Sequence, residues 1–207
     1  MESLVIGLVL YSAETQEILS DLAAKFSVDT FSDEKRDGTA STAKAEPGVF
    51  DVTTATYGAK PGPVTQALAK AWNDACASPS ASIVVVPSGT YKLREASFKG
   101  PCKAPIEIHV QGILQAPTDG SKLTKKDTWV GFEHVNMLSL SGGGNFDGQG
   151  ALSWSKNDCN KNKNCKSNAI NLRFNFITNS TVQDITSLNS KNFHMKNNIS
   201  CHIRSFT

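Results

Sequence analysis

Residues 141–154, SGGGNFDGQGALSW, combine glycines with oxygen-bearing side chains at spacings that binding loops use. A phosphate-binding loop needs a third glycine where Asp147 stands, and the charge of that carboxylate would repel the anion. A calcium loop needs more oxygen ligands than Asn145, Asp147 and Gln149 supply, and its closing glutamate is missing. The stretch therefore does not have the residues of either site.

A turn between two strands accounts for the same residues without a ligand. Gly142 and Gly144 allow tight backbone conformations, and an Asp-Gly pair at Asp147 and Gly148 favours a bend. We expect these four residues to be structural, and Trp154, which follows them, to pack.

Cysteines offer the next possible chemistry. The five cysteines form no CxxC pair, and no histidine lies close enough in sequence to complete a zinc pattern. The sequence therefore predicts no metal site. It favours two disulfides and one odd thiol, which is typical of an oxidising compartment.

Composition limits the remaining classes of function. The net charge is +2, and charged residues, 19% of the chain, are of both signs throughout, unlike the basic stripe of a nucleic-acid-binding protein. The longest apolar stretch, residues 4–11, is shorter than the roughly 20 residues that cross a membrane. That stretch is also a weak secretion signal, because Glu2 replaces the basic start.

Strands and one helix must position any site. Residues 1–47 read as a leader and a polar linker, and residues 65–77 place Leu68, Ala71, Trp72 and Ala75 on one helical face. From residue 83 onward, short apolar runs separated by Gly, Pro, Asn and Ser indicate strands, and runs such as those at Ile83, Ile106 and Trp129 recur about every 23 residues.

A solenoid explains this pattern best. No helices separate the runs, so we predict an all-β, right-handed parallel β-helix capped at its N-terminal end by the helix over 65–77. A β-sandwich is the alternative architecture.

Several stretches together resemble one family. GGGNFDGQGALSW is similar to a signature of the polygalacturonases, the pectin-degrading glycoside hydrolases of family 28. In order along residues 48–195, the chain also resembles the N-terminal half of plant exopolygalacturonases of the pollen type, through VFDVTTATYGAKPG, AWNDAC, IVVVPSGTYKL, GPCKAPIEIHVQGIL, WSKNDCNKNKNCK and DITSLNSKNFHM.

The resemblance implies a secreted cell-wall enzyme that hydrolyses α-1,4 linkages between galacturonate units with inversion. It implies pectin or polygalacturonate as the partner, and no cofactor, nucleic acid or membrane; we expect a monomer. The family's catalytic groups lie in four motifs, Asn-Thr-Asp, Gly-Asp-Asp, Gly-His-Gly and Arg-Ile-Lys, and none occurs in this sequence.

We therefore assign no catalytic residue and expect a truncated solenoid, with a divergent tail over 196–207, that is inactive alone. Two other hypotheses stay open: a non-catalytic pectin-binding or interaction protein, and a truncation product without function.

Further residues follow from the resemblance and the pattern. His194 lies one rung before the missing acid motif of the family, so with Asn192 it is a candidate for substrate contact. A structural histidine, hydrogen-bonded within the stack of rungs, is an equal alternative. Cys76 with Cys102, and Cys159 with Cys165, are candidate disulfides. Asn179 and Asn198 begin glycosylation sequons.

Overall fold

The structure, a computed structural model, describes residues 4–6, 46–60, 62–124, 127–159, 161–162, 165, 168–198 and 203–204. For residues 4–6, 198 and 203–204 it describes the backbone alone. Most of the predicted leader and linker over 1–47, and most of the tail over 196–207, lie outside the described residues. Those two boundaries stay predictions.

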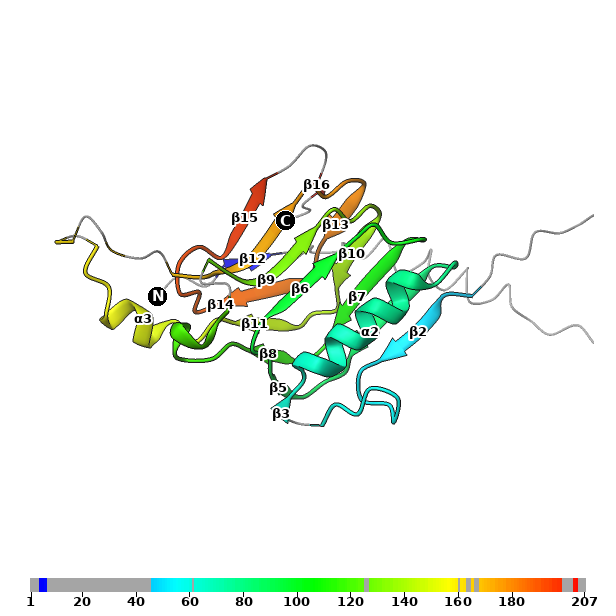
Figure 1. Ribbon diagram of the computed structural model, residues 1–207, viewed down its shortest axis with the longest axis horizontal. Coiled ribbons are helices and arrows are strands. Elements are labelled where there is room, and N and C mark those ends of the chain that lie inside the picture. Colours follow the sequence, from blue (N-terminus) through cyan, green and yellow to red (C-terminus); the bar gives the residue numbers. More distant parts are fainter. Residues whose placement is uncertain are drawn as a thin grey trace, which may run out of the picture. The chain divides into compact units, whose positions relative to one another are not determined.

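Three sheets make up the described chain (Figure 1). Sheet A contains, in order, β1 (Leu4–Ile6), β14 (Ile185–Leu188), β11 (Asn145–Asp147), β8 (Ile113–Gln115), β5 (Thr90–Lys92) and β3 (Gly62–Pro63). Sheet B contains β16 (Ile203–Arg204), β13 (Ser180–Val182), β10 (Leu138–Ser141), β7 (Ile106–Val110), β4 (Ser82–Val86) and β2 (Gly48–Asp51). Sheet C contains β15 (Met195–Asn198), β12 (Ile170–Asn175), β9 (Thr128–Glu133) and β6 (Ala96–Lys99).

The chain visits the sheets in a fixed order, B, then A, then C, and each round stacks on the previous one. Thus β7, β8 and β9 form one rung, and β10, β11 and β12 form the next. All pairings between these strands are parallel; β1 alone among the described strands pairs antiparallel, with β14. The predicted parallel β-helix is confirmed, and a sandwich of antiparallel sheets does not describe the molecule.

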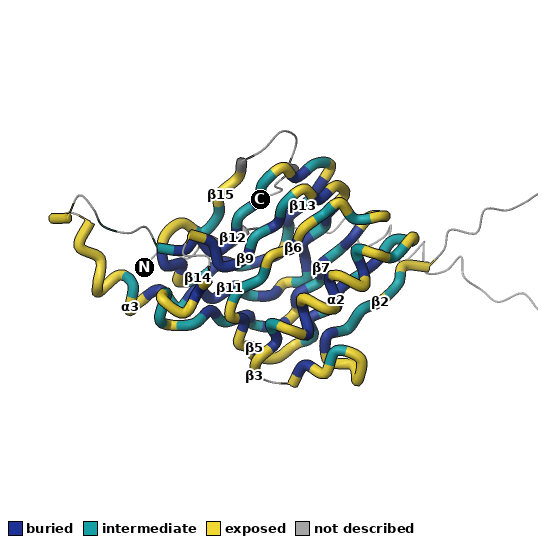
Figure 2. The backbone as a smooth tube through the Cα atoms, in the orientation of Figure 1, coloured by how far each residue is buried: buried dark blue, intermediate teal, exposed yellow. Residues whose placement is uncertain are grey.

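Buried and less buried residues alternate along strands such as β4 and β7, and Figure 2 colours the backbone by this burial. Side chains of successive residues therefore face the interior and the outer face in turn. Residues of equal register stack along the axis, and in sheet C three phenylalanines do so: Phe98, Phe132 and Phe174. Their ring centroids are 5.0 Å apart at each step, within the range for aromatic pairs. Phe132 and Phe174 are buried almost completely.

Helix α2 (Thr65–Ala77) closes the first rung. It follows β3, where the chain would otherwise form a third strand, and packs on β2, β4 and β6. The Trp72 ring lies 4.9 Å from that of Phe98, and its indole N–H donates to the Lys99 carbonyl at 3.3 Å. The predicted cap is confirmed, and the predicted Cys76–Cys102 disulfide joins its last turn to the segment after β6.

The turns differ in length from rung to rung, which corrects the predicted repeat of about 23 residues. Strands of sheet B begin at Ser82, Ile106, Leu138 and Ser180, and the run at Trp129 belongs to sheet C instead. Helix α3 (Ala151–Ser155) and the 3-10 turn η2 (Gly120–Lys122) lie in such turns. Insertions of this kind leave the stacking intact, because only the strands pair between rungs.

The glycine-rich stretch begins with a turn between sheets B and A. Gly142 has φ +114°, and a Cβ there would lie 2.4 Å from the Val110 carbonyl oxygen. At Gly144 the same oxygen would be 2.5 Å from a Cβ. Close approach of backbone to backbone therefore requires glycine at both positions, in line with the structural role we expected.

Phe132→Ala should lower the free energy of unfolding by about 3–5 kcal/mol, because it removes the central ring of a buried stack and leaves a cavity. Phe176→Ala is the matched control, since that ring is 53% exposed and its removal should change stability by about 0.5 kcal/mol or less. Urea denaturation of both variants measures the difference. Equal losses would contradict a role of the stack in stability.

Candidate functional site

Buried polar side chains gather where strands of sheet A end and strands of sheet C begin. Five of them form what we call the polar corner, with exposed fractions of 1–9%: Asp147, Asn171, Ser187, Ser190 and Lys191. Elsewhere in the described chain, the buried polar residues are serines and one threonine. Because buried amides and charges are unfavourable unless they are hydrogen-bonded, this corner must be an organised network.

Asn171, at the start of β12, links the strands of the corner. Its amide nitrogen lies 3.0 Å from Ser187 Oγ and 3.1 Å from the Leu188 carbonyl oxygen, and it also donates to the Phe146 carbonyl at 3.3 Å. His194 joins the same network through Nδ1, which is 3.0 Å from Ser187 Oγ. The candidate His194 is thus half-buried and oriented by the corner.

Asp147 and Lys191 form the charged part of the corner. The Asp147 carboxylate accepts from the Gln149 backbone N–H and from Asn189 Nδ2, each at 3.1 Å, so it holds the bend that the sequence predicted. Lys191 Nζ donates to the Gly148 carbonyl. Burial lowers the pKa of Lys191, and the carboxylates of Asp147 and Asp119 oppose that effect.

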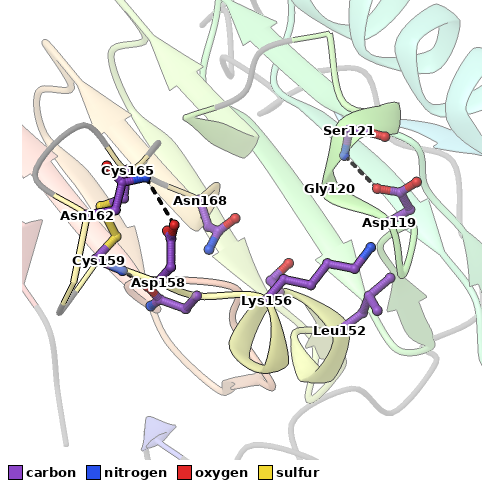
Figure 3. Close-up of a pocket in the computed structure, with 12 residues that line it drawn as sticks. Asp119, Gly120, Ser121, Leu152, Lys156, Asp158, Cys159, Asn162, Cys165 and Asn168 are labelled. Carbon is purple, nitrogen blue, oxygen red and sulfur yellow. Dashed lines mark hydrogen bonds between the residues drawn. A yellow bond between two sulfur atoms is a disulfide. The ribbon is translucent and has the colours of Figure 1, made fainter.

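Figure 3 shows a cavity of about 430 Å³. It is next to the polar corner, because its wall residue Gly120 lies close to the Lys191 side chain. It lies between η2 and the loop after α3, and Asn168, next to the start of β12, is one of its walls. The Cys159–Cys165 disulfide, as predicted, closes the loop on one side of the cavity. The lining consists of Asp119, Gly120, Ser121, Leu152, Ser153, Lys156, Asn157, Asp158, Cys159, Asn162, Cys165 and Asn168.

The cavity presents hydroxyls, amides, two carboxylates and one ammonium. The hydrogen bond from the Ser121 backbone N–H, 2.9 Å long, lowers the pKa of Asp119, and the charges of Lys156 and Lys122 act in the same direction. Asp158 accepts from Asn162 Nδ2 at 3.0 Å. Such a mixture of donors and acceptors suits the hydroxyl groups of a sugar.

The candidate Asn192 contacts a wall residue of the cavity. It is exposed, and its amide nitrogen donates to the Asn168 carbonyl at 3.1 Å, so it connects the segment before β15 with the cavity wall. The structure therefore brings Asn192 and His194 to one side of the polar corner. Whether either contacts a ligand stays a prediction.

Trp154 differs from the expectation that it packs. Its side chain is 43% exposed, because it belongs to the short helix α3, which stands in a turn outside the rungs. The indole N–H nevertheless donates to the Ser190 carbonyl at 2.9 Å. Trp154 thus anchors the loop to the polar corner by one hydrogen bond.

The two sequons differ in what the structure describes. Asn179 is exposed in a turn with φ +48°, and its side-chain amide donates to Asn136 Oδ1 at 3.0 Å. The side chain of Asn198 lies outside the described residues. Glycosylation at either position stays a prediction.

A serine, a histidine and a carboxylate also meet on the outer face of sheet B, but not as a catalytic relay. Ser141 Oγ and Glu107 Oε1 both contact Nδ1 of His109, at 3.1 and 3.2 Å, and Ser141 donates directly to Glu107 at 2.6 Å. A relay needs the serine and the carboxylate on opposite ring nitrogens. This group is a surface hydrogen-bond cluster.

Sequence reasoning missed Lys191, Asn171 and Asp119. Lys191 stands in NSKNFHM, where a lysine normally reads as solvated, and its burial depends on contacts with Gly148 and Gly120 in other turns. Within the described residues, no group of three or more His, Cys, Asp or Glu side chains could hold a metal ion. Nor is any described helix long and apolar enough to cross a membrane.

Known glycosyl hydrolases share sequence with this chain. Residues 76–204 match the family model of glycosyl hydrolases family 28. The chain is 50% identical over 141 residues to an exopolygalacturonase of Platanus acerifolia, covering 67% of this chain and 37% of that protein. It is 47% identical over 159 residues to a polygalacturonase of Gossypium barbadense, covering 75% of this chain and 38% of that one. The chain thus spans less than two fifths of the length of these relatives.

Lys191→Met should flatten the dependence of stability on alkaline pH. The unfolded chain keeps this proton up to about pH 10.5, whereas the folded protein releases it at lower pH because burial lowers the pKa of the ammonium. Between the lowered pKa and 10.5, the free energy of unfolding of the wild type should therefore rise relative to that of the variant.

Denaturant unfolding from neutral to alkaline pH measures this difference. Lys99→Met is the control, because Lys99 is 63% exposed and its substitution should leave the pH profile unchanged. Parallel profiles for the wild type and Lys191→Met would show that folding does not shift this titration.

Proposed function

The chain belongs to family 28 of the glycosyl hydrolases, and from that membership we propose that it is a portion of a polygalacturonase that acts on pectin. The activity would be inverting hydrolysis of α-1,4 linkages between galacturonate units. One observation carries this proposal: residues 76–204 match the family model, and relatives 46–50% identical to this chain are named polygalacturonases and exopolygalacturonases.

Hydrolysis with inversion needs a protonated carboxyl as acid and a carboxylate on the other side of the bond, roughly 6.5–9.5 Å away, with room for a water between them. The cavity carboxyl Asp119 has a lowered pKa, which is opposite to what a general acid requires. Asp147 is buried and bound by Gln149 and Asn189, so it is not available to a substrate. We infer that neither residue is the acid.

The four motifs that supply the catalytic groups in the family are absent from the 207 residues. We therefore propose that this chain by itself binds polygalacturonate without cleaving it. The polar corner and the adjoining cavity support the binding part of this proposal through their amides and hydroxyls, which suit sugar hydroxyls; the cavity also holds two carboxylates and one ammonium. The same observations favour the non-catalytic alternative, in which pectin binding is the whole function of the chain.

Secretion to the cell wall completes the proposal. Two disulfides, Cys76–Cys102 and Cys159–Cys165, suit an oxidising compartment, since cytosolic thiols are kept reduced. Pectin is an extracellular polymer, so a pectin-binding chain would meet its ligand there.

The chain should bind oligogalacturonate in isothermal titration calorimetry and release no reducing ends from polygalacturonate. His194→Gln should weaken binding about tenfold, equivalent to about 1.4 kcal/mol, because the half-buried imidazole is oriented by Ser187 of the polar corner. His109→Gln is the matched control, since that histidine is also half-buried and contacts a serine hydroxyl, but on sheet B.

Turnover by the 207-residue chain would overturn its proposed inactivity. Absence of any binding to oligogalacturonate would overturn the proposed binding function. Equal loss in the two histidine variants would remove the polar corner as the binding region.

A further inference from the structure

The outer face of sheet C carries two cations side by side. Arg173 in β12 and Lys196 in β15 are partners in the parallel register, and adjacent strands are about 4.8 Å apart. Arg173 points outward, because its neighbours Leu172 and Phe174 are fully buried on the inner face. His194 precedes Lys196 by two residues and so lies on the same face.

The row formed by Arg173 and Lys196 is open on the side of β9. The register partner of Arg173 in β9 is Gly131, which has no side chain to cover the guanidinium. Lys196 is exposed, and no described residue forms a salt bridge with it. A ligand can therefore approach this row from solvent.

The contacts of Arg173 leave a donor of its guanidinium without a hydrogen-bond partner in the part of the chain that the structure describes. Its Nη1 donates to Asp127 Oδ2 at 2.5 Å, and the Asp127 side chain is 59% exposed. Its Nε is buried and has no hydrogen-bond partner among the described residues. A guanidinium has five N–H donors in a planar fork, and an unpaired buried donor is unfavourable.

We propose that Arg173 and Lys196 form a carboxylate-binding subsite that recognises the free carboxylate of a galacturonate unit. This inference rests on the proposed binding of polygalacturonate and names the residues that read its charge. In the free protein Asp127 accepts a hydrogen bond from the guanidinium, and the sugar carboxylate takes the place of Asp127. The replacement lets the guanidinium rotate, so that Nε and a terminal nitrogen bind both carboxylate oxygens.

The exchange is favourable for a physical reason. The Arg173 side chain is 19% exposed and that of Asp127 is 59% exposed, so the carboxylate is already largely hydrated and loses little when it returns to solvent. The incoming carboxylate interacts with two cations instead of one, and it satisfies the donor that Asp127 leaves unpaired. Lys196 contributes as a point charge without a fixed geometry.

The subsite distinguishes galacturonate from its methyl ester. The ester carries no charge and cannot form the paired charge-assisted hydrogen bonds with Arg173. The chain should therefore prefer unesterified segments of the polymer, and raising the salt concentration should weaken binding to them.

Trigalacturonate and its fully methyl-esterified form are the probes, and calorimetric titration of the 207-residue chain is the measurement. Arg173→Gln should weaken trigalacturonate binding at least tenfold, and Lys196→Gln several-fold. Asp127→Asn should strengthen it several-fold, because the internal competitor loses its charge. None of the three should change affinity for the ester.

Lys99→Gln is the matched control. Lys99 is an exposed lysine of β6 on the same face of sheet C, already paired with Glu133, and its substitution makes the same change in net charge as Lys196→Gln. Its affinity for trigalacturonate should stay within twofold of the wild type. Arg173→Lys, which keeps the charge but loses the fork, should bind between the wild type and Arg173→Gln, and thermal unfolding checks that each variant folds.

The outcomes separate this inference from the proposed function. If the wild type binds neither probe, the proposed function fails and the subsite fails with it. If the wild type binds trigalacturonate but Arg173→Gln binds equally well, the subsite alone is wrong. If Asp127→Asn weakens binding as much as Arg173→Gln does, Asp127 positions the arginine and is not displaced, which overturns the exchange.

Discussion

Stacking of rungs is the interaction on which the rest of this structure depends. A short parallel strand cannot satisfy its own backbone or bury its inner face, so each rung is stable only through the rung above and below it. In sheet C this dependence is visible as a continuous aromatic stack from Trp72 of the capping helix through Phe98, Phe132 and Phe174. The helix is part of that stack, because Trp72 supplies the ring that the first rung would otherwise lack.

Because only the strands pair between rungs, the turns can vary and can hold functional side chains. The segment between β11 and β12 contains helix α3 and a disulfide loop, yet β11 and β12 keep their register with β8 and β9. Because the extra residues leave the solenoid at one corner, they build a cavity beside buried polar groups without interrupting the apolar interior. Hydrogen bonds between segments offset the cost of burying the polar corner. Asn171, for example, donates to Ser187 Oγ and to the Leu188 carbonyl.

Charge in this molecule acts locally. A net charge of +2 provides no general attraction for a polyanion, so recognition of polygalacturonate has to come from placed cations. The parallel strand register positions these cations, because it sets Lys196 next to Arg173 on the outer face of sheet C. Gly131, the other register partner of Arg173, leaves the row open. His194 and Asn171 both contact Ser187 Oγ, so part of the polar network lies within two residues of each cation.

The sequence by itself determined the architecture, the cap and the family, because these depend on local signals: alternation along strands, helical spacing over 65–77, and ordered motifs. It offered the two disulfides as candidates, and the structure shows both pairs. Tertiary structure alone decided which polar residues are buried and which are exposed. Lys191 is buried although no local pattern indicates it. Trp154 was expected to pack and is 43% exposed, and the run at Trp129 belongs to a different sheet from the runs at Ile83 and Ile106. The reason is that stacked partners come from different rungs. Arg173 meets Asp127 across 46 residues and Lys191 meets Gly148 across 43, so turns of unequal length set the contacts, and no local pattern records them.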